Sequence, residues 1–385
     1  MNRSLNFAVC ATLLFAGEAI AQTAEEATTN ASSSPVAYVY VARPTHVDGF
    51  AVAANGKLTA VPGSPFANIA LTHLNVNKNY LFGPGADGAS INSYSIASNG
   101  SLKAAGSVNA QKYNSDNCGG FGPTSLDTTG TTLYNIVNSE CEVLVQSFKI
   151  ESNGEFQYLG VADSGVPGDL FGVSNVAVLE NNKFAFQTLC GGDSFPGGGI
   201  VEYKRESNGL LAVTSDRPEI PPTKNPDDTY CPYFTIATDS SDHFAMVLSP
   251  LDDSWDSDGP DAIATYSVGS NGAATTKSTY ENMPSDAVDG AGTMSISPSS
   301  KLLAIGGDGF QVFHFNGGSQ VTKYSGAIQK GNNFIQFCWD SDNHLFALSD
   351  NGKVFVYTVT PTTITEASGS PYSIPEAGSI IALSK

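Results

Sequence analysis

The sequence predicts an all-β fold, a seven-bladed β-propeller in which four-stranded antiparallel blades stand in a ring. Three observations carry this prediction. An Asn-Gly dipeptide recurs six times behind a strand-like run, a polar turn recurs upstream of these hairpins, and one repeat is split between the two ends of the chain. Repeats of about 40 to 50 residues with four short strands each are typical of propellers.

The six Asn-Gly pairs predict six β-hairpins. Each pair follows a strand-like run, and in most copies a second short apolar run comes after it. Because Asn and Gly both tolerate positive φ, we expect a type I′ turn between the third and fourth strands, C and D, of a blade. The pairs are Asn55-Gly56, Asn99-Gly100, Asn153-Gly154, Asn208-Gly209, Asn271-Gly272 and Asn316-Gly317.

The polar turns predict the first two strands, A and B, of each blade. A short apolar run follows every turn and is the expected B strand. The turns lie at residues 76–79, 128–131, 180–183, 239–242, 298–301 and 340–343, and the B strands at 80–82, 132–134, 184–186, 244–246, 302–304 and 345–347. The sixth unit ends with a strand at 354–360, where Thr362-Thr363 replaces Asn-Gly.

The seventh unit is divided between the chain ends. The mature N-terminus begins with a B strand at 37–41 and has no A strand before it, while the C-terminus ends in a lone apolar strand at 379–383. We expect this last strand to complete blade one, because ring closure removes the open strand edges that invite aggregation. A β-sandwich is the alternative, and the split repeat favours the ring.

The first residues of the chain predict export. Arg3 is followed by a mostly apolar run at 5–15, and Ala19-Ile20-Ala21 offers a small-x-small cleavage pattern. We therefore expect a signal peptide over 1–21, a flexible leader over 22–34 and the propeller over 35–385. The destination is the periplasm or the exterior, and no segment of the mature chain is predicted to span a membrane.

Five cysteines remain after this cleavage. The predicted disulfides are Cys118–Cys141 and Cys190–Cys231, since an exported chain permits them and these four residues fall in loops. Cys338 lies in an apolar run and is the expected buried thiol. The alternative is that all five are reduced, and metal binding is disfavoured because no CxxC or nearby His pair occurs.

The charge is strongly acidic. The chain has 18 basic and 37 acidic residues and a formal net charge of −19. Such a surface repels nucleic acid and anionic lipid, and it disfavours a heavily phosphorylated substrate. We expect a monomer that takes a neutral, sugar-like ligand or engages a glycan or protein.

Two segments carry a family resemblance. Residues 55–66 read NGKLTAVPGSPF, echoed by SGSPY at 368–372, and residues 295–304 read SISPSSKLLA. The chain resembles the lactonase-type seven-bladed β-propellers, which include sugar-lactone hydrolases such as 6-phosphogluconolactonases and fungal muconate-lactonizing enzymes. The resemblance covers residues from about 35 to 385 and implies a hydrolase fold.

The chain departs from this family at the expected active site. Active members carry His in a Pro-His context at the start of strand A, with Glu and Arg on the same face. The corresponding places here read Pro123-Thr124, Val173-Ser174 and Pro232-Tyr233. We therefore transfer no catalytic residue from the family.

The B–C and D–A connections of a propeller share one end of the ring, where ligands usually bind. We call this end the loop face. In blade one it carries His46 beside Arg43 and Asp48, and His46 is the candidate general base. Asp308 is a further catalytic candidate, and Asp193, Tyr230 and Trp255 are candidate ligand-binding residues, with Tyr113 as an additional aromatic.

The longest loop, at residues 251–261, partly mimics a calcium loop. Asp256 and Asp258 alternate with Ser254 and precede Gly259, but Thr265 stands where the distal Glu is needed. The other interpretation is a solvated acidic loop, and no cofactor is required by the sequence.

Two functions remain open. One is an exported hydrolase of a sugar lactone or related neutral ester, which follows from the fold resemblance. The other is a non-catalytic propeller that binds a glycan, a cell-wall polymer or a protein through its loop face, which follows from the absent family residues. Whether the chain is an enzyme is not decided by the sequence.

Overall fold

The structure is a computed structural model that describes residues 34–114, 120–138, 142–167, 172–191, 198–252, 254, 256–257, 259–324 and 329–385. The compact unit is Pro35–Lys385. The predicted signal peptide and most of the leader lie outside the described residues, as do Cys118, Cys141, Asp193, Trp255 and Asp258.

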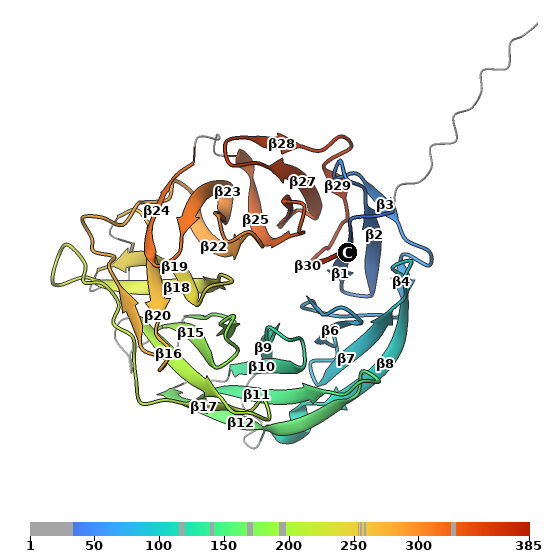
Figure 1. Ribbon diagram of the computed structural model, residues 1–385, viewed down its shortest axis with the longest axis horizontal. Coiled ribbons are helices and arrows are strands. Elements are labelled where there is room, and N and C mark those ends of the chain that lie inside the picture. The colour runs from blue at the N-terminus through green and yellow to red at the C-terminus, as the bar shows by residue number, and fades with distance from the viewer. Residues whose placement is uncertain are drawn as a thin grey trace, which may run out of the picture. The chain divides into compact units, whose positions relative to one another are not determined.

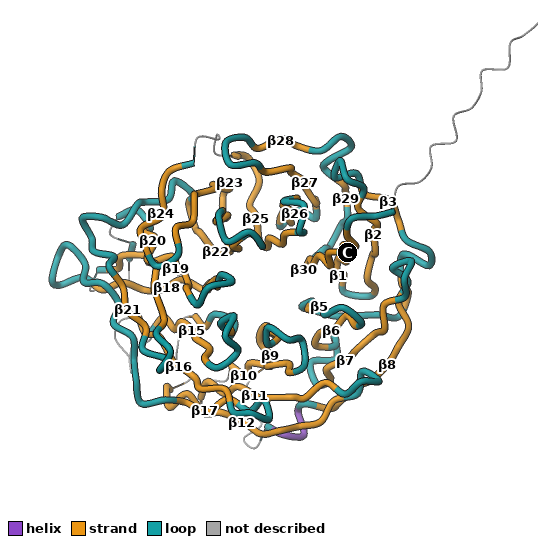
Figure 2. Tube along the Cα trace, viewed as in Figure 1, coloured by secondary structure: helices purple, strands orange, loops and turns teal. Residues whose placement is uncertain are grey.

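The compact unit is built almost entirely of antiparallel β-sheets arranged around a central opening (Figure 1). The one helix among the described residues is the 3₁₀ turn η1 (Gln111–Tyr113). Figure 2 shows the strands and the loops that join them around the ring. Within the described part of the chain, no helix has the length and apolarity to cross a membrane.

The first three blades follow the predicted order of strands. Blade one contains β30 (Ser379–Ser384), β1 (Ala37–Arg43), β2 (His46–Val52) and β3 (Leu58–Ala60), with β4 (Phe66–Ala67) paired to β2. Blade two contains β5 (Asn75–Val76), β6 (Tyr80–Pro84), β7 (Ser90–Ile96) and β8 (Leu102–Asn109). Blade three contains β9 (Gly120–Leu126), β10 (Thr132–Asn138), β11 (Glu142–Ile150) and β12 (Phe156–Pro167).

Blades four and five are similar, except that the A strand of blade four is broken in two. Blade four contains β13 (Gly172–Val173), β14 (Ala177–Val178), β15 (Phe184–Cys190), β16 (Gly198–Arg205) and β17 (Leu211–Val213). Blade five contains β18 (Thr229–Thr238), β19 (His243–Leu251), β20 (Ala262–Val268) and β21 (Ala274–Thr276).

The last two blades are joined in one eight-stranded sheet. It contains β22 (Asp289–Ile296), β23 (Leu302–Asn316), β24 (Ser319–Lys323), β25 (Gln329–Trp339), β26 (His344–Ser349), β27 (Lys353–Val359), β28 (Ile364–Glu366) and β29 (Tyr372–Ser373). The strand β23 folds back on itself, because Phe315 N–H donates to the Lys301 carbonyl at 2.8 Å. Its two halves are therefore the B and C strands of blade six, and the strand order of the described residues is consistent with the seven predicted blades.

The closure predicted from the split repeat is confirmed. The strand β1 lies between β2 and β30, with a regular antiparallel register from Ala37↔Ser384 to Ala42↔Ser379. Ile380 is fully buried and packs with Val39 and Val41 against blade seven. The last strand of the chain is thus the innermost strand of the first blade.

The turn type predicted for the Asn-Gly pairs is wrong. All six glycines have positive φ, from +63° to +101°, but none of the preceding asparagines does. In five hairpins the glycine N–H bonds back three residues, as Gly56 does to Ala53, which matches a three-residue loop ending in a left-handed residue. In these five the asparagine Oδ1 instead accepts the N–H two residues ahead. In blade six the loop is Gly317-Gly318, closed by the Asn316↔Ser319 pair.

The turn glycines also dock each blade on the one before it. A Cβ on Gly100 would lie 2.7 Å from the ring of Tyr38 in blade one, and a Cβ on Gly154 would lie 2.6 Å from the ring of Tyr80 in blade two. A Cβ on Gly56 would lie 2.9 Å from Ala367 and 3.1 Å from Val356 of blade seven, so the same kind of contact passes through the point of closure. These positions exclude a side chain for two reasons, the positive φ and the lack of space.

The cysteines that the structure describes serve packing and cross-linking. Cys190 and Cys231, one of the two predicted pairs, form a disulfide with a Cα–Cα distance of 5.1 Å between blades four and five. Cys190 is the last residue of β15 and Cys231 is the third residue of β18, so both lie in strands and not in loops, which corrects the position expected for them. Cys338 is free and buried, and burial raises the pKa of its thiol.

A pair of Ile→Ala substitutions tests the closure. Ile380→Ala removes a fully buried side chain from the closing strand and is expected to lower the free energy of unfolding by about 2 to 5 kcal/mol. Ile335→Ala, on a residue that is 38% exposed in β25, is the matched control and should cost under about 0.5 kcal/mol. Urea unfolding followed by fluorescence would measure both. Equal effects of the two substitutions would contradict a large contribution of the closing strand to the free energy of unfolding.

Candidate functional site

Blade one brings three of the residues of interest together on the loop face. Arg43 ends β1 and pairs directly with His46 at the start of β2, so both side chains lie on one face of the sheet. Asp48 is two residues beyond His46 and shares that face because strand side chains alternate. Arg43 Nη1 and His46 Nε2 are each 3.7 Å from Asp48 Oδ2. We call Arg43, His46 and Asp48 the blade-one cluster.

The three side chains of the blade-one cluster are not joined to one another by direct hydrogen bonds. Asp48 Oδ2 and Arg43 Nε are buried without a hydrogen-bond partner, and 3.7 Å is too long for a direct hydrogen bond. His46 Nδ1 is 3.0 Å from Thr45 Oγ1. A water or a polar ligand could bridge these groups, but none of the cavities described below is lined by them.

The other predicted site residues that the structure describes do not join this cluster. Asp308 lies at the tip of the folded strand β23, in register with Asp289 and Asn333. Tyr230 is 9% exposed, packs between blades four and five and lines a cavity of about 370 Å³ with residues 220–224. Tyr113 stacks on Tyr158 with ring centroids 3.9 Å apart. Among the described residues no three His, Cys, Asp or Glu side chains gather as a metal site, and Asp256 stands in an exposed loop.

A second polar site lies on the loop face between blades five and six. It is a cavity of about 440 Å³ enclosed by the end of β19, the B–C connection of blade five and the segment that leads into β22. We call it the aspartate pocket, because Asp261, Asp286 and Asp289 line it together with Ser249. The remaining lining residues are apolar, glycine or serine, and none is basic: Leu251, Ser257, Gly259, Pro260, Ala287, Val288 and Gly290.

The chain brings two of these carboxyls together through backbone pairing. The isolated bridge Ala262↔Ser285 and the hydrogen bond from Asp286 N–H to the Asp261 carbonyl align the two segments. Asp261 Oδ1 accepts from the Ser249 hydroxyl. Asp286 is 6% exposed and accepts from the Val288 N–H, while its Oδ2 is buried without a partner. A buried polar atom of this kind is costly and is common at functional sites.

The two carboxyls have different proton affinities. Burial, and then the negative charge of Asp261, raises the pKa of Asp286 to about 7. Burial also raises the pKa of Asp261, with a contribution from Asp289, but the Ser249 hydroxyl and the Ala291 N–H oppose this. Near neutral pH one carboxyl can therefore donate a proton while its neighbour accepts one. Such a pair is able to perform general acid–base chemistry.

Sequence reasoning missed this pair. Asp261 appeared only as the last residue of an acidic loop, and Asp286 stands alone between Ser285 and Ala287 without a motif. No local signal marks Asp286, because its special property is burial beside a carboxylate 25 residues away.

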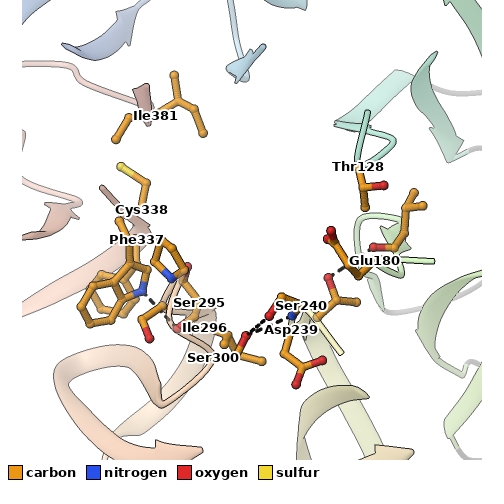
Figure 3. Close-up of a pocket in the computed structure, with 16 residues that line it drawn as sticks. Thr128, Glu180, Asp239, Ser240, Ser295, Ile296, Ser300, Phe337, Cys338 and Ile381 are labelled. Atoms are coloured by element: carbon orange, nitrogen blue, oxygen red, sulfur yellow. Dashed lines mark hydrogen bonds between the residues drawn. The ribbon is translucent and has the colours of Figure 1, made fainter. Parts of the chain in front are cut away.

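A further cavity of about 440 Å³ lies at the opposite mouth of the ring, among the A–B turns (Figure 3). Several of its polar groups already have partners. The Ser240 and Ser300 hydroxyls are 2.8 Å apart, and Asp239 accepts the N–H groups of Ser241 and His243. Figure 3 shows Ile381, Phe337 and Cys338 across the opening from Thr128 and Glu180. These contacts stabilise turns, and we assign no chemistry to them.

Comparisons with known proteins support the fold. No protein-family model matches the sequence, and no curated protein matches it significantly. Among solved structures it is similar to a candidate 6-phosphogluconolactonase from Bacteroides uniformis, with a TM-score of 0.67, 11% identity and coverage of 90% of this chain and 99% of the other. It is also similar to the periplasmic gluconolactonase of Pseudomonas aeruginosa, with a TM-score of 0.64, 14% identity and the same coverage.

A hypothetical selenium-binding protein from Sulfolobus tokodaii is a third similar structure, with a TM-score of 0.56, 10% identity and coverage of 92% and 93%. At these identities the likeness concerns the fold alone. The chain therefore has the lactonase-type propeller fold that its sequence predicts.

The aspartate pocket makes a prediction for stability against pH. A carboxyl whose pKa rises from 3.8 to about 7 on folding stabilises the protein fully below pH 3.8, and this contribution is lost as the pH rises through about 7. Asp286→Asn removes this titration. On going from pH 4 to pH 8, the free energy of unfolding of the variant should therefore increase relative to that of the natural protein by about 1 to 4 kcal/mol. Urea midpoints at both pH values would measure this, with Asp227→Asn on an exposed carboxyl as control. A constant difference between variant and natural protein at both pH values would contradict the assignment.

Proposed function

We propose that the chain is an exported hydrolase of a neutral sugar lactone or a related ester, with Asp261 and Asp286 as its acid–base pair. The observation that carries this proposal is the aspartate pocket, a cavity on the loop face in which the carboxyls of Asp261 and Asp286, both with a raised pKa, lie together. Concave sites with groups of perturbed pKa are the usual location of catalysis.

The proposed reaction uses both carboxyls in turn. Asp261 accepts a proton from a water molecule as the water oxygen attacks the lactone carbonyl carbon. The bond from that carbon to the ring oxygen then breaks, and Asp286 gives its proton to the departing oxygen. The product is a hydroxy acid, and transfer of the proton from Asp261 to Asp286 restores the pair.

The charge of the pocket supports a neutral substrate. Three aspartates and no basic residue line the cavity, so a phosphorylated lactone would meet repulsion without a compensating Lys or Arg. The same charge favours departure of the product, which ionises to a carboxylate. Export agrees with this substrate class, and it is supported by the signal-like N-terminus and by the Cys190–Cys231 disulfide.

The blade-one cluster is the competing place for the reaction. His46 would act as base and Arg43 would stabilise the oxyanion, with Asp48 orienting both. Asp308 belongs to blade six, where it pairs with Asp289, and not to this cluster in blade one. The aspartate pocket is preferred because its carboxyls line a cavity of about 440 Å³ and have a raised pKa.

Lactone hydrolysis followed as acid release at constant pH tests the proposal and separates the two sites. With glucono-δ-lactone as substrate, Asp286→Asn and Asp261→Asn should each lower kcat by about 10² to 10⁴-fold. His46→Ala and the surface control Asp227→Asn should leave it unchanged. The activity should fall above about pH 7, because Asp286 loses its proton there.

The other outcomes are equally informative. Loss of turnover in His46→Ala alone would move the site to blade one. A 6-phosphorylated lactone hydrolysed better than the neutral one would contradict the electrostatic argument. No turnover of any lactone, together with saturable binding of a neutral sugar, would favour the non-catalytic binding propeller.

A further inference from the structure

One position of the repeat carries a hydroxyl that reaches from one blade to the next in three blades. It lies six residues before the turn asparagine and is Ser93 in blade two, Ser147 in blade three and Thr265 in blade five. The Ser93 hydroxyl donates to the Gly154 carbonyl at 2.6 Å and Thr265 donates to the Ser319 carbonyl at 3.2 Å, each on the following blade. Ser147 Oγ accepts from Leu211 N–H in the same manner. A small hydroxyl therefore closes the space between blades at these three positions.

Blade four has Glu202 at this position. Its side chain is 1% exposed and extends towards blade five, where a Cβ on Gly272 would lie 2.6 Å from Oε1. The other carboxyl oxygen, Oε2, is buried without a hydrogen-bond partner. A larger, charged residue has replaced the hydroxyl, and the structure does not satisfy it as it satisfies Ser93 and Thr265.

Glu202 lines a groove of about 450 Å³ between blades four and five. The groove is completed by residues 216–219 and by 273–276 of the neighbouring blade, so that Asp216 and Glu219 stand beside Glu202. Arg217 is the one basic residue in the lining, but its guanidinium donates to the carbonyls of Thr214, Asp216 and Ser164. The groove is therefore acidic, and its one guanidinium, that of Arg217, is already hydrogen-bonded to backbone carbonyls.

We propose that this groove binds a primary ammonium group, with Glu202 as the counter-ion and Asp216 as a flanking acceptor. An ammonium has three donors and one charge, which suits a buried carboxylate oxygen without a hydrogen-bond partner. A divalent metal fits less well, because among the described residues no group of three His, Cys, Asp or Glu side chains, including Glu202 with Asp216 and Glu219, has an arrangement that could hold a metal ion. The groove is also large enough for a small organic ligand.

The proton affinity of Glu202 agrees with this assignment. Burial, and then the charge of Asp216, raises the pKa of Glu202 to about 7, while Thr214 and Arg217 oppose the shift. Without a ligand the ionised form is unfavourable. A bound cation would stabilise it, so the affinity should increase as the pH rises through about 7.

Titration calorimetry with n-butylamine at pH 8 tests the proposal. We expect saturable binding that weakens at least tenfold in Glu202→Gln, and to a smaller extent in Asp216→Asn. Glu206→Gln, which removes the same charge from an exposed position of blade four, should bind like the natural protein. n-Butanol, which lacks the charge, should not bind. Equal affinity in Glu202→Gln and the natural protein, or no saturable binding, would overturn the proposal.

Two additional measurements keep the test decisive. If Glu202→Gln does not fold, the natural protein should still bind n-butylamine more tightly at pH 8 than at pH 5.5, where the amine is cationic throughout. Groups other than Glu202 that face the groove are Asp216, Glu219 and Arg217. Affinity that does not change with pH would then overturn the proposal.

The blocked peptide acetyl-Gly-Lys-Gly-amide distinguishes the two sources of the ammonium group. Tighter binding of the peptide than of n-butylamine would indicate a lysine of a partner chain, and weaker binding would indicate a free amine.

Discussion

The structure depends on one recurrent contact, the packing of a turn glycine in blades one to six against the start of the B strand in the preceding blade of the ring. Gly100 lies on Tyr38, Gly154 on Tyr80 and Gly317 on His243. Tyrosine hydroxyls strengthen some of these contacts, as Tyr38 donates to the Ser98 carbonyl at 2.6 Å. Since a blade has no large core of its own, the interfaces between blades provide most of the burial.

Ring closure follows from the same contact. Gly56 of blade one packs against Ala367, Val356 and His344 of blade seven, where His344 Nδ1 lies 2.7 Å from Asp340 Oδ2 in a buried hydrogen bond. The strand β30 then adds its ladder to β1. The end of the chain and the start of the chain thus meet in one blade, and no repeat is left with an unpartnered side. A fixed ring holds the loop connections in fixed positions, which is a requirement for preorganised chemistry.

Departures from the repeat are the places where chemistry becomes possible. The aspartate pocket is found where the pairing of β22 with β23 shifts register between Asp289 and Thr293 and the approach to β22 bends beside the blade-five loop. Glu202 occupies the repeat position at which Ser93 and Thr265 of other blades donate a hydrogen bond to the following blade. In both places a carboxyl is buried without a full set of partners, whereas the buried Asp127 is fully engaged by Arg205 and backbone N–H groups. The contrast separates carboxyls that stabilise the fold from those that remain available to a ligand.

The sequence by itself determined the repeat, the number of blades and the closure by the last strand, because hairpin and turn signals are local and recur at a regular spacing. It also placed His46, Arg43 and Asp48 together, since strand alternation and a short connection fix their face. It did not determine the turn geometry, because Asn-Gly suits more than one loop and only backbone pairing selects among them. Tertiary structure alone decided the properties of Asp286 and Glu202. Burial and a nearby carboxylate set the proton affinity of each, and both are created by segments far apart in the chain.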